Sequence, residues 1–138
     1  MEKNYQELVN NQIFFGGAAD AEEAIANESI DVVIDLRLVE PGEVNYKRIH
    51  APIADEEAEI APSIEHAISE VMKAYHNGEK VFFHCGSGSG RAGTIATATL
   101  LELGQAKTVE EAEQKAKAIR PKVNVREPMK KALQQIYE

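Results

Sequence analysis

The sequence predicts an α/β fold with a central, mostly parallel sheet of about four to five strands flanked by helices. Two apolar runs of strand length, DVVIDL at residues 31–36 and KVFFH at residues 80–84, lack the polar alternation of a sheet with one face in water. Such runs are typical of strands buried on both faces. Between them lies the clearest amphipathic helix of the chain, whose apolar residues recur at helical spacing: Ile64, Ala67, Ile68, Val71, Met72 and Tyr75.

The N-terminal part of the chain predicts a strand followed by a helix. Residues 13–15, IFF, form a short apolar run that ends at Gly16 and Gly17, and we expect this glycine pair to make a turn. Asp20 and Glu23 have the spacing of a capping box. The first helix should therefore begin at Asp20.

The segment between the two buried runs starts irregularly. A Pro-Gly pair at residues 41–42 marks a loop, and residues 46–53 alternate loosely enough to predict a further strand. The stretch ADEEAE at residues 54–59 predicts an exposed acidic loop. The amphipathic helix follows this loop and should stop at the Asn-Gly pair of residues 77–78.

The C-terminal part predicts three helices. A largely apolar helix over residues 91–103 follows the strand 80–84 after a glycine-rich loop. Thr108 and Glu111 again have capping-box spacing and predict the start of a second helix. Pro128 suits the first turn of a third helix, because proline needs no hydrogen-bond acceptor there.

Composition limits the function classes. With 138 residues, 43% of them apolar, the chain can bury one core, and we expect a single domain spanning residues 1–138. The net charge of −8 argues against nucleic acid or anionic membranes as partners, because both need clustered Lys and Arg. One cysteine excludes an internal disulfide, and the first residues lack a signal-peptide pattern, so we expect a cytoplasmic location. The four histidines are scattered, and we expect no metal site.

The segment HCGSGSGR at residues 84–91 carries the chemistry. Five residues separate Cys85 from Arg91, between a strand and the start of a helix. Such a loop can direct backbone N–H groups and the positive end of the helix dipole inward and hold a phosphate dianion. The same field should stabilise the thiolate of Cys85 as a nucleophile. Arg91 can offer two parallel N–H donors to phosphate oxygens and to a trigonal transition state.

This segment resembles the phosphate-binding signature His-Cys-x-x-Gly-x-x-Arg of the cysteine-dependent protein tyrosine and dual-specificity phosphatases, with every fixed position matched. The resemblance implies a small, single-domain, prokaryotic-like member with a phosphotyrosine-phosphatase-like fold. It implies hydrolysis through a phosphocysteine intermediate without cofactor or metal. Cys85 would be the nucleophile, Arg91 the phosphate clamp and His84 a support for the loop. The phosphate-binding residues would be Gly86, Ser87, Gly88, Ser89, Gly90 and Arg91.

Such a mechanism needs a carboxyl group that protonates the leaving oxygen and later activates water. In dual-specificity phosphatases this aspartate lies upstream of the nucleophile, on a loop between a strand and a helix. Asp55 occupies that place, with Glu56 and Glu57 as alternatives. The competing interpretation is a solvated acidic loop without a catalytic role.

Some positions depart from the family pattern or stay open. The residue after the signature arginine is normally Ser or Thr, whose hydroxyl assists departure of the thiolate, whereas this chain has Ala92, with Thr94 two residues later as a supporting hydroxyl. The segment RPKVNVREPMKKAL, which starts at Arg120, resembles the family's closing segment, where Asn or Gln helps to position water or the loop. Arg126 occupies that place, and it is equally consistent with a substrate contact or a surface charge. Arg37 suits either a functional role or an ordinary ion pair.

Other glycine loops fit the segment less well. Gly88, Gly90 and Gly93 satisfy a dinucleotide-binding fingerprint, but no strand that ends in an acidic residue follows at the required distance. A Walker loop fails because the chain has no Gly-Lys-Ser/Thr. Rhodanese-like sulfurtransferases have a loop that is one residue shorter. A buried structural cysteine in an ordinary turn is the remaining alternative to Cys85 as a nucleophile.

Two functional hypotheses follow. The first is a protein tyrosine or dual-specificity phosphatase that acts on a phosphorylated protein or a small phosphomonoester. The second is a catalytically weak pseudophosphatase that binds a phosphorylated partner or another oxyanion, which Ala92 and Arg126 favour. Neither the substrate nor the oligomeric state has a signature in this sequence.

Overall fold

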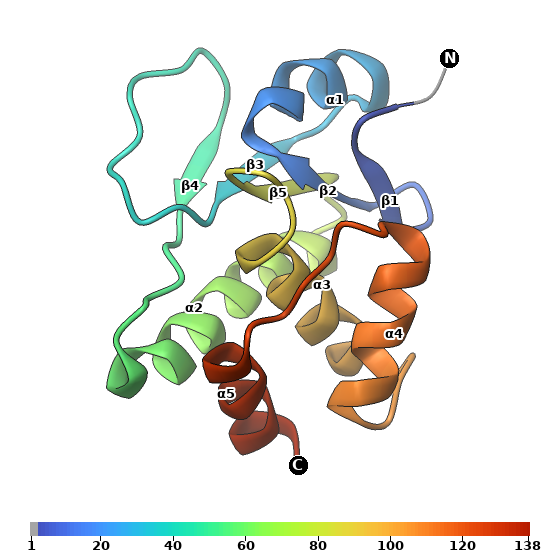
Figure 1. The fold of residues 1–138 in the computed structure, drawn as a ribbon. Coiled ribbons are helices and arrows are strands. Elements are labelled where there is room, and N and C mark those ends of the chain that lie inside the picture. The colour runs from blue at the N-terminus through green and yellow to red at the C-terminus, as the bar shows by residue number, and fades with distance from the viewer. Residues whose placement is uncertain (1–2) are drawn as a thin grey trace.

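The computed structural model describes residues 3–138, which form a five-stranded sheet with helices on both faces (Figure 1). The order of the strands in the sheet is β1-β2-β5-β3-β4. β1 pairs with β2 antiparallel, and the other three pairs are parallel. The predicted mostly parallel α/β sheet is therefore confirmed. The strands are β1 (Gln6–Val9), β2 (Ile13–Gly17), β3 (Val32–Asp35), β4 (Arg48–His50) and β5 (Val81–Cys85).

The helices divide unevenly between the two faces of the sheet. α1 covers one face, and the larger layer formed by the later helices lies on the other (Figure 1). Within residues 3–138, no helix combines the length and the apolarity needed to cross a membrane. The helical elements are a short 3-10 turn, η1 (Ala18–Asp20), followed by α1 (Ala21–Glu28), α2 (Glu57–His76), α3 (Arg91–Glu102), α4 (Val109–Ile119) and α5 (Glu127–Tyr137).

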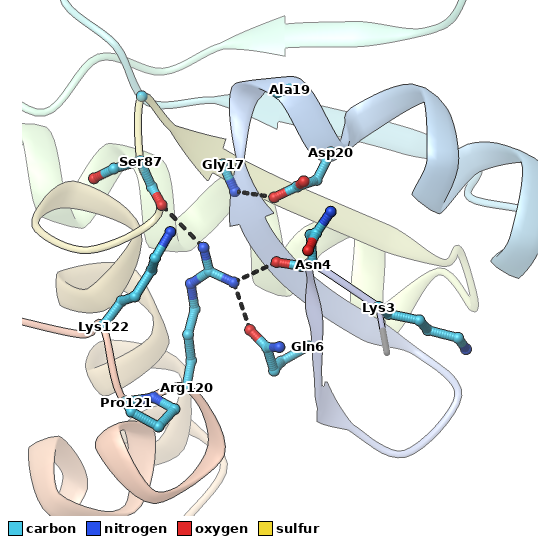
Figure 2. Close-up of a pocket in the computed structure, with 11 residues that line it drawn as sticks. Lys3, Asn4, Gln6, Gly17, Ala19, Asp20, Ser87, Arg120, Pro121 and Lys122 are labelled. Atoms are coloured by element: carbon cyan, nitrogen blue, oxygen red, sulfur yellow. Dashed lines mark hydrogen bonds between the residues drawn. The ribbon is translucent and has the colours of Figure 1, made fainter. Parts of the chain in front are cut away.

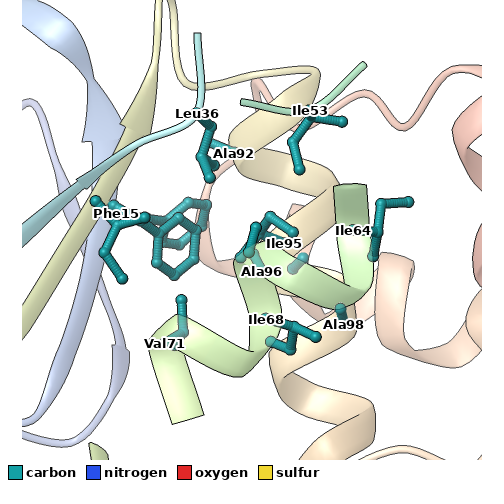
Figure 3. Packing of buried hydrophobic residues seen from close by; sticks show 14 of the residues in the cluster. Phe15, Leu36, Ile53, Ile64, Ile68, Val71, Ala92, Ile95, Ala96 and Ala98 are labelled. Atoms are coloured by element: carbon teal, nitrogen blue, oxygen red, sulfur yellow. The ribbon is translucent and has the colours of Figure 1, made fainter. Parts of the chain in front are cut away.

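The central strands bury both faces, and successive side chains enter two separate cores. Phe14 and Phe82 pack with Tyr5 and with Ala21 and Ala24 of α1. Phe15 and Phe83, one residue further along each strand, stack at 5.5 Å between ring centroids in the larger core on the other face. Side chains of α2 and α3 fill the space beneath these rings (Figure 3). This two-sided burial explains why the strand sequences read as unbroken apolar runs.

Several details of the fold depart from the sequence predictions. The segment QELV carries no strand signal because β1 is an edge strand, with only Leu8 among its residues buried. Residues 57–59 belong to α2 rather than to a loop, because buried Ile60 and Ile64 draw the segment into the core. Gly16 and Gly17 end β2 instead of making a turn.

The glycine pair of β2 serves close approach between segments. A Cβ on Gly16 would lie 2.9 Å from the Cβ of Tyr5, and one on Gly17 would lie 2.9 Å from the carbonyl oxygen of Gly86. Asp20 stands at the start of α1 but makes no capping bond to that helix, because its carboxylate accepts from the Gly17 N–H at 2.9 Å.

The predicted cap of α4 is confirmed. Thr108 Oγ1 accepts a hydrogen bond from the N–H of Glu111 at 3.1 Å. The side-chain oxygen thereby satisfies one of the N–H groups that the first turn of a helix leaves without a partner.

The parallel strands bring their carboxyl ends to one edge of the sheet. The register pairs Gly17 with Cys85, and Asp35 with both His84 and His50. In open α/β sheets this is the edge at which ligands bind. The strand order places β5, which carries Cys85, at the centre of the edge.

Candidate active site

Cys85 ends the central strand β5, and α3 begins at Arg91. The cysteine is 5% exposed, and its Sγ accepts a hydrogen bond from the N–H of Ala92 at 3.4 Å. The sulfur therefore faces the first turn of α3, where the helix dipole favours negative charge. The strand, glycine loop and helix predicted around this cysteine are confirmed.

The residues between Cys85 and Arg91 form the glycine loop, residues 86–90. Every carbonyl oxygen of this loop accepts a hydrogen bond from outside the loop. The N–H donors come from three separate parts of the chain, namely η1, α3 and the connection between α4 and α5. They are the N–H of Ala18 to Gly86 O at 3.0 Å, Arg120 Nη2 to Ser87 O at 2.9 Å, Arg120 Nε to Gly88 O at 3.0 Å, the N–H of Asn124 to Ser89 O at 3.0 Å, and the N–H of Thr94 to Gly90 O at 2.9 Å.

These bonds determine where the amides of the loop point. In a planar trans peptide the N–H lies opposite the preceding carbonyl, so the N–H groups of residues 87–91 face away from the five donors. Within the described part of the chain, no N–H of residues 86–90 donates to another protein group. Unpaired amides converging at a helix N-terminus form an anion-binding concavity.

Gly88 is the position of the glycine loop at which a residue without a side chain is most needed. Its φ is +78°, a region that side chains rarely adopt. A Cβ at this position would also lie 2.6 Å from the carbonyl carbon of Gly16. Gly88 thus lets the loop press against the end of β2.

Arg91 links the glycine loop to the segment that precedes α2. Its Nε donates to the carbonyl of Ile53 at 2.8 Å, and its Nη2 donates to Asp55 Oδ1 at 2.6 Å. The structure thereby brings together the residues predicted as clamp and acid, which lie 36 positions apart. Glu56 occupies the N-cap position of α2 without a side-chain capping bond, and Glu57 lies in the first turn. Neither forms an ion pair with Arg91 within residues 3–138.

His84 is buried next to Cys85 on β5. It is 2% exposed, and its Nδ1 lies 3.1 Å from the carbonyl oxygen of Cys85. Burial lowers the pKa of His84, against the smaller opposing effects of that carbonyl and of Asp35. The imidazole is therefore neutral at pH 7 and suited to orienting the backbone at Cys85.

The family of the chain follows from its sequence match. Residues 13–138 match the sequence model of the dual specificity phosphatase catalytic domain, a span that contains Cys85, the glycine loop, Arg91 and Asp55. The chain belongs to the dual specificity phosphatase family. No curated protein matches the sequence.

Solved structures agree with this fold at low sequence identity. A mouse putative dual specificity phosphatase complexed with zinc tungstate has a TM-score of 0.83 at 20% identity, covering 99% of this chain and 88% of that one. Human DUSP28 has a TM-score of 0.79 at 19% identity, covering 99% and 95%. PTPMT1 in complex with PI(5)P has a TM-score of 0.78 at 15% identity, covering 97% and 94%. The chain thus has the α/β fold of these phosphatases.

A buried ion pair lies at the end of β3, beside the strand that carries Cys85. Asp35 is fully buried and accepts three hydrogen bonds from Arg37, two from the guanidinium and one from the backbone N–H. Burial alone would raise the pKa of Asp35, but the bonds from Arg37 outweigh it and the pKa lies below its usual value. Arg37, which the sequence left open, therefore holds a buried carboxylate.

The other predicted supporting residues surround the loop. The Thr94 hydroxyl donates to Gly90 O at 2.8 Å, so it braces the loop rather than the sulfur. Ala92 is buried and brings only its N–H to the sulfur. Arg126, at the start of α5, lies beside the loop, since a Cβ on Gly90 would be 3.8 Å from its Nε. The hydroxyls of Ser87 and Ser89 lie 2.8 Å apart.

Sequence reasoning missed the role of Arg120 beside the glycine loop. It follows α4 directly and is 4% exposed, although arginine is rarely buried. It supplies two of the five donors to the glycine loop. The only sequence signal was its place before Pro121, which marks a helix end but does not say where the side chain goes.

Proposed function

We propose that the protein hydrolyses phosphomonoesters through a phosphocysteine intermediate on Cys85, and that residues 1–138 act as one phosphatase domain. The observation that carries this proposal is the glycine loop, whose carbonyls are all bonded outward. Preorganised amides beside a nucleophile stabilise negative charge that develops on oxygen in the transition state. Arg91 at the end of the loop adds a planar pair of N–H donors.

In the first step the Cys85 thiolate attacks the phosphorus atom. The S–P bond forms while the P–O bond to the leaving group breaks, and the leaving oxygen takes a proton from the carboxyl group of Asp55. The equatorial oxygens of the trigonal phosphoryl group would accept from the loop amides and from Arg91.

In the second step water attacks the phosphocysteine. Asp55, now a carboxylate, takes a proton from the water as the new P–O bond forms. The S–P bond breaks, the thiolate is restored and inorganic phosphate leaves. Nothing is oxidised or reduced, and both steps use groups of this chain alone.

The contact between Arg91 and Asp55 fits this sequence of events. The Nη2 group that donates to Asp55 Oδ1 at 2.6 Å is one that a bound phosphate dianion would also use. The phosphate would compete for this guanidinium and so release the Asp55 side chain toward the leaving oxygen. Substrate binding would therefore rearrange this contact.

The proposed substrates are phosphorylated proteins, on tyrosine or on serine and threonine, or small phosphomonoesters. The family match supports the first class. The second is supported by PTPMT1, a protein of the same fold that was solved in complex with PI(5)P. A panel of a phosphotyrosine peptide, a phosphoserine peptide and PI(5)P, assayed for phosphate release, separates these classes by kcat/KM.

The decisive experiment is hydrolysis of p-nitrophenyl phosphate without added metal by wild type, Cys85→Ser and Arg91→Lys. We expect an active wild type, no turnover by Cys85→Ser, and a loss of at least about a hundredfold for Arg91→Lys, because an ammonium cannot replace the two-donor fork. Acid quenching during turnover should trap phosphate on the wild-type chain but not on Cys85→Ser. Equal turnover by wild type and Cys85→Ser would refute the proposal.

The second candidate function is that of a weak or inactive pseudophosphatase that binds a phosphorylated partner. The observation that favours it is Ala92, which leaves the sulfur with a backbone donor but no hydroxyl. In that case wild type would bind phosphate or vanadate in a calorimetric titration and yet fail to hydrolyse p-nitrophenyl phosphate.

A further inference from the structure

In the connection between α4 and α5, the side chain of Arg120 lies against the glycine loop. Arg120 has an extended backbone, with φ −133° and ψ 101°, and the following Pro121 prevents the helix from continuing. Its guanidinium lies between the loop and strand β1 (Figure 2). It therefore contacts the loop from the side opposite to the amides.

Each donor group of Arg120 has a defined acceptor. Nε and Nη2 reach the neighbouring carbonyls of Gly88 and Ser87, at 3.0 and 2.9 Å. Nη1 reaches the carbonyl of Asn4 at 2.7 Å and also the side-chain oxygen of Gln6 (Figure 2). The contacts to β1 and the residues before it fix the plane of the guanidinium, and the fork then fixes two consecutive peptide groups of the loop.

Among the described residues, Arg120 is buried with only neutral oxygens as hydrogen-bond acceptors, unlike an arginine in a buried ion pair. No carboxylate in the described range 3–138 forms a salt bridge with it. Burial lowers the pKa of Arg120, against smaller attractions to Asp20 and Cys85. A charge that is costly to bury and is bonded only to neutral oxygens suits a role in shaping the acceptor groups it holds.

The outer side of the loop is otherwise open. A cavity of about 390 Å³ lies there, and its lining includes Ser87, Asp20, Arg120 and Lys122. Without the guanidinium, water from this cavity could satisfy the Ser87 carbonyl, but water would not fix its direction. Arg120 thus adds rigidity that solvent cannot supply.

We propose that Arg120 is a positioning residue for catalysis, which holds the carbonyls of Ser87 and Gly88 outward so that the next two amides face the oxyanion. This inference rests on the proposed function, because it assigns the anion to the amide side of the loop. Arg120 itself touches neither the substrate nor the sulfur. It acts through the two peptide groups that it orients.

The test compares Arg120→Met and Arg120→Lys with Lys122→Met. Methionine removes the fork while keeping an apolar stem, and lysine restores the charge with a single donor group. Lys122→Met is the matched control, because Lys122 lines the same cavity, carries the same charge and makes no hydrogen bond to the loop within the described residues. Thermal unfolding of each variant reports whether the fold is intact.

Three readouts separate positioning from simple stability. For Arg120→Met we expect kcat/KM on p-nitrophenyl phosphate to fall by about a hundredfold or more, as when an oxyanion donor is lost. The dissociation constant for inorganic phosphate should rise at least about tenfold, and alkylation of Cys85 by iodoacetamide should slow at pH 6 more than at pH 9. Arg120→Lys should recover only part of each loss, and Lys122→Met should match wild type.

The proposal is overturned if folded Arg120→Met binds phosphate as wild type does, or if Arg120→Lys restores wild-type values in full. It is also overturned if Lys122→Met weakens phosphate binding equally, because charge alone would then account for the effect. If Arg120→Met does not fold, the comparison of Arg120→Lys with wild type decides the question. Phosphate binding needs no turnover, so an inert wild type would refute the proposed hydrolysis while this test still applies.

Discussion

The glycine loop and the segment that carries Asp55 meet at Arg91, and they are held in place in different ways. The glycine loop has every carbonyl bonded to another segment, and Cys85, which precedes it, is 5% exposed. In the acid segment, residues 53–55, the backbone is held as far as Ala54, whose N–H donates to Ser63 Oγ at 3.0 Å. The side chain of Asp55 is 59% exposed and, among the described residues, is held by Arg91 alone.

This contrast teaches that anion binding and proton transfer depend on different amounts of structure. The fold itself prepares the glycine loop, because its donors come from η1, α3 and the connection between α4 and α5. The position of Asp55 depends on the guanidinium of Arg91, which the proposed mechanism also assigns to the substrate. Substitutions in the glycine loop should therefore weaken phosphate binding and slow turnover together. Substitutions in the acid segment should slow turnover and leave phosphate binding nearly unchanged.

The strongest way to break the glycine loop is Gly88→Ala. The new methyl group would meet the carbonyl carbon of Gly16 at 2.6 Å in a backbone region with φ +78°. We expect kcat/KM to fall at least about a hundredfold and phosphate binding to weaken with it. Gly78→Ala is the control, because Gly78 has the same φ of +78° but nothing within 4 Å. It should lose about 1 kcal/mol of stability and keep its activity.

The acid segment is tested by Asp55→Asn. On phenyl phosphate, whose leaving group needs a proton, kcat should fall about a hundredfold, and the inhibition constant for phosphate should stay within a small factor of wild type. The loss should be smaller on p-nitrophenyl phosphate. Glu57→Gln is the control, because Glu57 and Asp55 line the same groove beside α5. This variant should behave as wild type. The reverse pattern would move the acid role to Glu57.

A smaller effect is expected from Ala92→Ser, which adds a hydroxyl next to the amide that already contacts the sulfur at 3.4 Å. A hydrogen bond worth about 1 kcal/mol to the departing thiolate would raise its release by roughly fivefold. Rapid-quench kinetics should show faster breakdown of the phosphoenzyme with an unchanged rate of formation. No change in breakdown would mean that the backbone N–H is sufficient.

The smallest effect concerns pH and the buried His84. Because its pKa in the folded protein lies below the ordinary value of 6.5, the unfolded chain binds more protons just below that pH. Stability should therefore fall as the pH drops below 6.5, by at most about 1.4 kcal/mol per pH unit for this one group. Urea unfolding between pH 5 and 8 should show this slope in wild type and a weaker slope in His84→Gln. Equal slopes would place the titration elsewhere.

Local patterns were sufficient for the central strands, most helices and the loop around Cys85. Apolar runs buried on both faces and the Thr108 cap depend on neighbours close in sequence, so a periodicity argument reaches them. Local patterns failed for β1, which is a short edge strand. They also failed for the start of α2, where burial of Ile60 outweighs an acidic sequence. Asp55 was predicted by resemblance, and its contact with Arg91 became visible only in three dimensions.

By itself, the sequence determined which residues make up the candidate motif, since Cys85, its glycines and Arg91 lie within one short segment. Only the tertiary structure decided which way the peptide groups of that segment point. Their carbonyls are held by Ala18, Arg120 and Asn124, which are remote in sequence, and a hydrogen bond between remote groups leaves no periodic trace along the chain. Orientation of the loop is therefore a property of the fold, whereas its chemistry is a property of the motif.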